Sequence, residues 1–74
     1  MDFKQATDRA RAACIRLPDI AEATKSSPAL IKQARMDPGN EAFRNPPQGW
    51  ERAVAKLARK RARALERLAD RLEK

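Results

Sequence analysis

The side chains of this chain that could do chemistry are basic and amide groups rather than catalytic ones. The 74 residues include no His and no Tyr, and the single Cys, Cys14, has no imidazole to activate it. The number of ligands excludes a tetrahedral Cys/His zinc site, and no Gly-rich phosphate loop is present. We therefore expect no enzyme activity, no metal and no cofactor, and we expect Cys14 to be a small buried apolar residue.

Side chains that can form specific hydrogen bonds gather in the stretch SPALIKQARM, residues 27–36. A Gln amide can make a bidentate contact with adenine, a Lys can donate to guanine, and an Ala methyl can touch the methyl group of thymine. This pattern predicts a helix that reads base edges in a DNA groove. The residues expected to face outward and contact bases are Ser27, Pro28, Ala29, Lys32, Gln33 and Met36.

The charge balance points to a polyanionic partner. Lys and Arg outnumber Asp and Glu by 17 to 10, which gives a net charge of +7. Residues 1–44 hold 8 basic and 6 acidic residues, whereas residues 45–74 hold 9 and 4. Such a surface favours DNA, RNA, an acidic protein or an anionic membrane, and a solvated helix face is the ordinary alternative. The candidate contacts to a DNA backbone are Lys25, Arg35, Arg44, Arg52, Lys56, Lys60 and Arg63, and Ser27 with the amides that begin its helix could hold a phosphate.

The elements that must position these side chains are predicted to be helices. Ala, Leu, Arg, Lys and Glu are frequent, while β-branched residues are few and never alternate with polar ones, so strands are not supported. We predict an all-α fold with four helices, at about residues 3–15, 18–24, 28–36 and 50–73. In the first helix, Asp2 is a suitable N-cap, and the predicted apolar face consists of Phe3, Ala6, Ala10, Ala13 and Cys14.

The second and third helices form a predicted helix-turn-helix unit. Pro18 and Pro28 suit first turns, and Ser27 is a good N-cap for the third helix. Ala21 is the small residue that lets two helices cross closely, and Ile31 points back into the core. An ordinary helical hairpin in a small bundle would show the same pattern, so this alternative stays open.

The segment between the third and fourth helices is predicted to be a loop, because residues 37–49 contain three prolines and both glycines of the chain. Phe43 is the expected anchor of this loop in the core. On a helical wheel, the last helix has three stripes. Trp50, Val54, Leu57, Leu65, Leu68 and Leu72 make the apolar stripe; Arg52, Lys56, Lys60, Arg63, Arg67 and Lys74 make the basic one; Glu51, Glu66, Asp70 and Glu73 lie between the two.

Arg61 falls in the middle of the apolar stripe and predicts the point where the last helix leaves the core of its own chain. Beyond it, Leu65, Leu68 and Leu72 need another partner. We expect them to form the interface of a homodimer held mainly by residues 50–74. The alternative for these leucines is packing against the first helix of the same chain.

The stretch LPDIAEATKSSPALIKQARMDP resembles the helix-turn-helix of bacterial and phage repressors. DIAEAT is similar to a pattern of the lactose-repressor family, and FRNPPQGWERAVAKLA resembles the segment after the recognition helix in the lambda-repressor/Cro-like (XRE-type) family. The similarity covers about residues 5–60. It departs at the turn, where the family has Gly followed by an apolar residue and this chain has Lys25 and Ser26. A left-handed backbone at Lys25 would cost roughly 1 kcal/mol.

These observations predict a single domain, residues 1–74, that acts as a sequence-specific regulator of transcription on double-stranded DNA. The resemblance implies a phage- or prophage-type protein that binds as a dimer, with helix 28–36 in the major groove. The chain has no room for a small-molecule effector domain. It also lacks an apolar run that could form a signal peptide or a membrane span, so a cytoplasmic, nucleoid-associated protein of bacterial or phage origin is expected.

Two other functions compete with DNA regulation. In the main alternative, the protein is a non-catalytic adaptor whose basic last helix docks on an acidic partner, such as the transcription machinery. RNA binding is the weaker third possibility, because single-stranded bases stack on exposed aromatic rings. Trp50 and both Phe residues are expected in the core instead.

Overall fold

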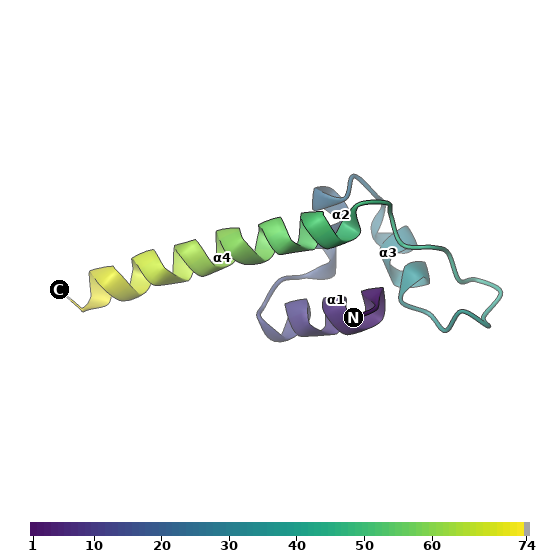
Figure 1. Ribbon diagram of the computed structural model, residues 1–74, viewed down its shortest axis with the longest axis horizontal. Helices are drawn as coiled ribbons and strands as arrows, with labels where there is room; N and C mark the ends of the chain where they lie inside the picture. Colours follow the sequence, from purple (N-terminus) through teal and green to yellow (C-terminus); the bar gives the residue numbers. More distant parts are fainter. Residues whose placement is uncertain (74) are drawn as a thin grey trace.

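A computed structural model describes residues 1–73, which form an all-α fold of four helices (Figure 1). These are α1 (Phe3–Ala12), α2 (Leu17–Ala23), α3 (Pro28–Ala34) and α4 (Trp50–Leu72). No strand occurs in this range, and none of its helices combines the length and apolarity that crossing a bilayer requires. The predicted all-α fold with a long last helix is confirmed. Lys74, the last residue of the predicted basic stripe, lies outside the described residues.

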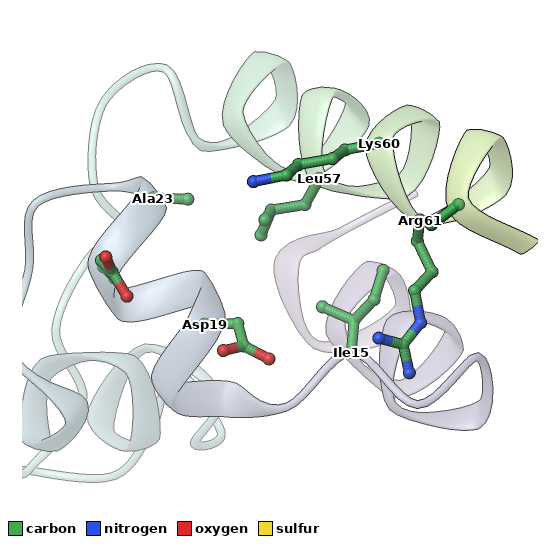
Figure 2. Close-up of a pocket in the computed structure, with 8 residues that line it drawn as sticks. Ile15, Asp19, Ala23, Leu57, Lys60 and Arg61 are labelled. Carbon is green, nitrogen blue, oxygen red and sulfur yellow. The ribbon is translucent and has the colours of Figure 1, made fainter.

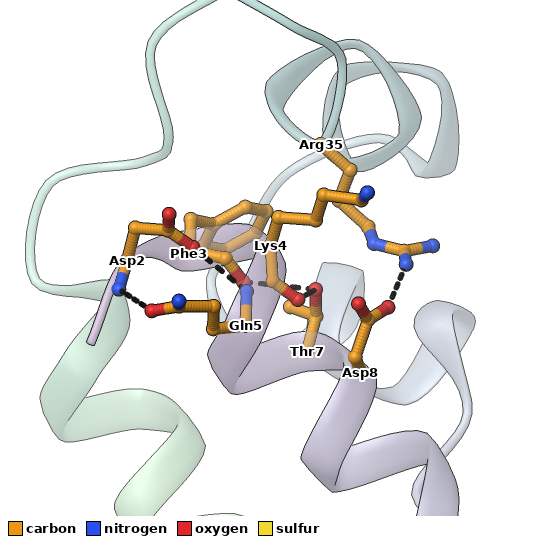
Figure 3. A network of polar contacts seen from close by, with 7 residues as sticks. All are labelled: Asp2, Phe3, Lys4, Gln5, Thr7, Asp8 and Arg35. Atoms are coloured by element: carbon orange, nitrogen blue, oxygen red, sulfur yellow. Dashed lines mark hydrogen bonds and ion pairs between the residues drawn. The ribbon is translucent and has the colours of Figure 1, made fainter.

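Helix α1 begins where Asp2 was predicted to cap it. The Asp2 carboxylate accepts a hydrogen bond from the Gln5 amide (2.8 Å), and the Gln5 side chain accepts one from the Asp2 amide (3.0 Å; Figure 3). The helix ends about three residues earlier than predicted, because Cys14 adopts a left-handed backbone with φ 66°. The amide of Ile15 then donates to the Ala10 carbonyl at 2.9 Å and closes the end in a Schellman motif.

Helix α2 ends in the same way and turns directly into α3. Lys25 has φ 57°, and the Ser26 amide donates to the Ala21 carbonyl at 2.8 Å. The left-handed backbone predicted at Lys25 is therefore confirmed. The Ser27 hydroxyl accepts from the Leu30 amide at 3.1 Å and caps α3, as predicted.

The core lies where α1, α2, α3 and the first turns of α4 meet. Its buried apolar residues are Phe3, Ala10, Ile15, Ile20, Ala21, Ile31 and Ala34, and Leu17, Trp50, Val54 and Leu57 pack against them. Phe3 and Trp50 meet edge to face, with ring centroids 5.1 Å apart. Thr7 is also fully buried, and its hydroxyl donates to the Phe3 carbonyl at 2.9 Å. The predicted inward positions of Ala21 and Ile31 are thus confirmed.

Three residues expected in the core lie elsewhere. Ala13 and Cys14 are exposed, because the left-handed residue turns the chain away before the apolar face of α1 can continue. The prediction of a buried Cys14 is therefore wrong. Phe43 is only half-buried and does not belong to the core cluster, so the loop of residues 35–49 is not anchored there as expected. This loop is held partly by the Arg44 amide, which donates to the Gln33 carbonyl at 3.4 Å.

Helix α4 extends well beyond the other three helices. It has 23 residues, and the molecule measures 54 × 20 × 18 Å because the distal part of α4 projects beyond the other helices (Figure 1). Leu57 is the last α4 residue packed on the core, and every described residue from Ala58 onward is exposed. The molecule therefore consists of a small packed body and a projecting helix.

Candidate nucleic-acid interface

Helix α3 presents the side chains predicted to face outward. Ser27, Pro28, Ala29 and Lys32 are exposed, and Met36, just beyond the helix, is 37% exposed. Gln33 is half-buried. The opposite side of α3 carries Ile31 and Ala34, which are buried in the core. The predicted outward position is therefore confirmed for Ser27, Pro28, Ala29, Lys32 and Met36, whereas Gln33 is less exposed than expected.

The Ser27 hydroxyl is occupied by its capping role. It accepts the hydrogen bond of the Leu30 amide, and Pro28 has no amide hydrogen to offer a phosphate. The Ser27 hydroxyl group still has its own hydrogen to donate, as every Ser hydroxyl has. The Ser27 hydroxyl thus caps α3, and the phosphate site that the sequence suggested there stays a prediction.

A cationic hollow lies beside Lys32. Its volume is about 570 Å³, and it is formed where the end of α1, the start of α2, α3 and the middle of α4 come together. Its lining residues are Arg11, Cys14, Ile15, Arg16, Leu17, Pro18, Lys32 and Arg61. Four of these carry a positive charge and none carries a negative one, so their fields add in the hollow. We call this group, Arg11, Arg16, Lys32 and Arg61, the basic hollow.

A second hollow, of about 510 Å³, lies between α2 and α4 (Figure 2). Asp19 and Glu22 line it from α2, while Lys60 and Arg61 line it from α4. In Figure 2 the Lys60 side chain extends toward Ala23, and the Arg61 side chain extends toward Ile15. The mixed charges offset each other, so this hollow is a poorer site for an anion than the basic hollow. Lys60, a predicted backbone contact, therefore lines a different surface from Lys32.

Arg35 is half-buried between α1 and the end of α3. Its guanidinium pairs with Asp8 of α1 (Figure 3), and its side chain is only 16% exposed. The Nε atom is buried and has no hydrogen-bond partner. Arg35 was predicted as a contact to the DNA backbone. In the structure its ion pair with Asp8 instead connects the end of α3 to α1.

The remaining predicted backbone contacts are spread over separate elements. Lys25 is exposed in the turn before α3. The Arg44 guanidinium donates to carbonyls of its own loop, at Phe43 (2.9 Å) and Glu41 (3.4 Å). Arg52, Lys56 and Arg63 are exposed along α4. The structure brings none of these into the basic hollow.

Sequence reasoning missed three members of the basic hollow: Arg11, Arg16 and Arg61. Arg11 lies in the last turn of α1, and Arg16 is the N-cap residue of α2. Arg11 precedes the short 13–16 connection and Arg16 is its last residue, so their position just before the predicted second helix was a detectable hint. Arg61 lies 29 positions after Lys32 in the sequence, and only the packing of α4 on α2 brings the two residues to one hollow.

The predicted dimer leucines are open to solvent. Leu65, Leu68 and Leu72 are 56%, 53% and 75% exposed, so they do not pack against α1 of the same chain. Arg61 donates from its guanidinium to the Cys14 carbonyl at 3.2 Å. This contact lies just beyond Leu57, where the apolar contact of α4 with the body ends, as the sequence predicted.

Comparison with protein-family models, with curated proteins and with solved structures gave no match to this chain.

Proposed function

We propose that this protein is a sequence-specific regulator that binds double-stranded DNA as a dimer, with α3 in the major groove. The observation that carries the proposal is the position of Lys32. It lies on the exposed face of α3 and also lines the basic hollow, together with Arg11, Arg16 and Arg61. A base-reading face and a phosphate-binding surface are thus adjacent, as a helix inserted between two DNA backbones requires.

The exposed face of α3 would read the sequence. Lys32 donates to guanine, Ala29 contacts a thymine methyl, and Gln33 pairs with adenine from its half-buried position. Ser27, Pro28 and Met36 complete the face around them. Each bidentate base contact discriminates by about 1–3 kcal/mol, so the loss of Gln33 should relax preference at one base pair.

The basic hollow would hold a phosphate backbone without reading sequence. Its cations release counterions on binding, so affinity should fall steeply as salt rises. Arg11 and Arg16 replace Arg35 among the contacts that we infer, because the Arg35 side chain is paired with Asp8. Lys25, Arg44, Arg52, Lys56, Lys60 and Arg63 remain candidates for weaker contacts.

A dimer is part of the proposal because one recognition helix covers too few base pairs to specify a genomic site. Two copies would read half-sites about one helical turn apart. The resemblance to lambda-repressor/Cro-like proteins supports a phage-type or bacterial regulator at the nucleoid. A truncated chain that ends at Lys60 should lose the dimer in light scattering, and one that stays dimeric would refute the role of α4.

The test is a mobility-shift titration with promoter DNA from the gene neighbourhood, against random competitor DNA. We expect Arg16→Gln to reduce affinity about tenfold and to lower the salt slope by about one. Arg59→Gln is the matched control, because Arg59 is an exposed α4 residue outside the basic hollow and its loss removes the same charge. If both substitutions had equal effects, the binding would depend on overall charge and not on the basic hollow.

One observation favours the alternative of a protein-interaction adaptor. The distal part of α4 is exposed on all sides and carries basic residues that extend far from α3. In that case an acidic protein would bind the isolated distal helix as well as the whole chain. Gln33→Ala would then leave every binding property unchanged, whereas the DNA proposal requires a changed operator preference.

A further inference from the structure

The packed body and the exposed distal leucines lie on the same face of α4. On a helical wheel, the three apolar residues of the proximal half that pack on the core point in the same direction as Leu65, Leu68 and Leu72. These three leucines are more than half exposed, and no other helix of the described chain lies beside them (Figure 1). A partner that buries them must therefore approach the face that also carries the body.

The position of the body decides how a second copy of the chain can approach. In a parallel pair, the two stretches of α4 that carry the bodies would also face each other, and both bodies would occupy the same space. A twofold axis across the helices instead places the bodies at opposite ends of the pair. Each distal helix then lies on the exposed half of the other, beyond the body.

We propose that residues 61–73 of α4 pair in antiparallel orientation with the same segment of a second copy, and that the last turn of each α4 docks at the hollow between α2 and α4 of the other copy. Burial of the distal leucines drives the pairing, because the transfer of apolar surface out of water is favourable. Three leucines from each chain make a small interface, so the dimer belongs to the weak class that forms at micromolar concentration.

The spacing of the leucines and the position of the body together select one register. When Leu65 lies level with Leu68 of the second copy, Leu72 lies level with Arg61, and all three leucines of each copy lie against the other copy. A shift of seven residues outward pairs only Leu68 with Leu72. An equal shift inward brings Leu72 level with Val54, which packs on the core.

This register brings the last turn of the second α4 to the hollow between α2 and α4 (Figure 2). Leu72 of the second copy lies level with Arg61. Arg61 lines the hollow, and so do the apolar groups of Ile15, Ala23, Leu57 and Ala64. A twofold axis across the helices keeps each edge of α4 on its own side, so Arg71 of the second copy lies on the side of Ala64. The hollow thus receives one apolar and one cationic side chain.

The α2 wall of the hollow supplies carboxylates for Arg71. Asp19 accepts a hydrogen bond from the Arg16 amide at 3.2 Å, and Glu22 lines the hollow beside it. Within residues 1–73 neither carboxylate is in an ion pair, although Lys60 lines the same hollow. The Arg71 guanidinium of the second copy would pair with Glu22, and such a pair of opposite charges fixes register and orientation more than affinity.

An anionic membrane is the other partner that an exposed amphipathic helix could have. Helices that lie on such membranes are rich in Lys and Arg on the polar face. The segment that carries the leucines, residues 62–73, holds three Arg and three acidic residues, so it has no net charge to attract anionic headgroups. A second copy fits this segment better, because it covers the leucines and also brings a cation to the carboxylates of α2.

Cysteine trapping measures the orientation and the register directly. In a Cys14→Ser chain, Arg61→Cys and Leu72→Cys would be mixed without DNA at about 100 µM, with a size tag on one variant, and disulfide-linked products counted on a non-reducing gel. We expect the mixed dimer to exceed either self-dimer at least about fivefold. The two cysteines are level in the mixed pair, whereas like positions differ in height by about 16 Å, beyond the reach of a disulfide.

Arg59→Cys mixed with Leu72→Cys is the control for random collision. Residue 59 is close in height to residue 61 but lies on the opposite side of α4, so this mixed product should be at least about tenfold lower. Preferential self-trapping of Leu72→Cys would indicate a parallel pair. Preferential trapping of Leu68→Cys with Leu72→Cys would indicate the outward register. Either result would overturn the proposal.

A charge exchange tests the contact at the hollow. We expect Glu22→Lys and Arg71→Glu each to weaken the dimer about fivefold in sedimentation equilibrium, and the chain with both changes to regain the original affinity to within about twofold. Arg63→Glu is the matched control, because residue 63 faces away from the leucines, and it should change the affinity less than about twofold. A double variant weaker than both single variants would overturn the docking at the hollow.

The inference deepens the dimer of the proposed function and rests on it for its biological role, but every measurement is made without DNA. A trapped antiparallel dimer that fails to bind promoter DNA would contradict the proposed function alone. A chain that stays monomeric at about 100 µM, or that binds anionic vesicles as a monomer, would contradict the pairing.

Discussion

Two halves of one helix have opposite surroundings in this protein. In the proximal half of α4, Trp50, Val54 and Leu57 pack on the body. In the distal half, Leu65, Leu68 and Leu72 stay more than half exposed. The apolar stripe has the same direction on both halves and is interrupted between them by Arg61. An apolar stripe therefore predicts a buried face, but it does not say which molecule buries it.

The largest effect that tests this contrast is the loss of a packed side chain from the body. Ile20 is fully buried, and Ile20→Ala should lower the free energy of unfolding by about 2–5 kcal/mol, enough to unfold so small a domain. Leu68→Ala should cost the monomer less than about 0.5 kcal/mol, because Leu68 has no core contact to lose. Urea titration at low protein concentration measures both, and similar costs would contradict the division into body and projecting helix.

A medium effect should come from the turn that ends α2. Lys25 has a left-handed backbone, which Gly adopts without strain, so Lys25→Gly should stabilise the body by about 1 kcal/mol. Ala23→Gly, two residues earlier within the helix, should destabilise it by about the same amount. Thermal unfolding of both variants tests the sign. A Lys25→Gly chain that melts lower would mean that the lysine side chain stabilises the turn in another way.

The smallest effect tests the boundary between the two halves. Arg61→Leu would join the proximal and distal parts of the apolar stripe into one and would remove the contact with the Cys14 carbonyl. We expect dimerisation to tighten by roughly threefold, about 0.7 kcal/mol, with little change in the stability of the body. Sedimentation equilibrium gives the dimer constant. A weaker dimer would show that Arg61 belongs to the dimer interface instead of marking where that interface ends.

The local features of the fold were predictable because they depend on neighbouring residues. Asp2 and Ser27 cap helices through amides three residues away, and Lys25 follows from the turn that two adjacent helices require. The end of α1 was not predictable in this way. A left-handed Cys14 has no sequence pattern of its own, because Gly or Asn usually fills that position. Its exposure follows from that backbone.

The candidate site was only partly predictable. The outward face of α3, with Lys32 and Ala29, follows from helical periodicity and agrees with the structure. The pairing of Arg35 with Asp8 and the approach of Arg61 to Lys32 join residues far apart in the chain. Helical periodicity predicts the direction in which a side chain points from its own helix, but it does not predict which residues of other elements that side chain contacts.

The sequence by itself determined the presence of four helices, the caps at Asp2 and Ser27, and the inward positions of Ala21 and Ile31, because these depend on interactions within a few residues. It also determined that the last helix outruns the core, since Arg61 interrupts the apolar stripe. Only the tertiary structure decided which cations share a surface. The packing of α1, α2, α3 and α4 decides which charged side chains lie close together. That packing is set by the shape and burial of the core residues. The surface cations themselves contribute little to it.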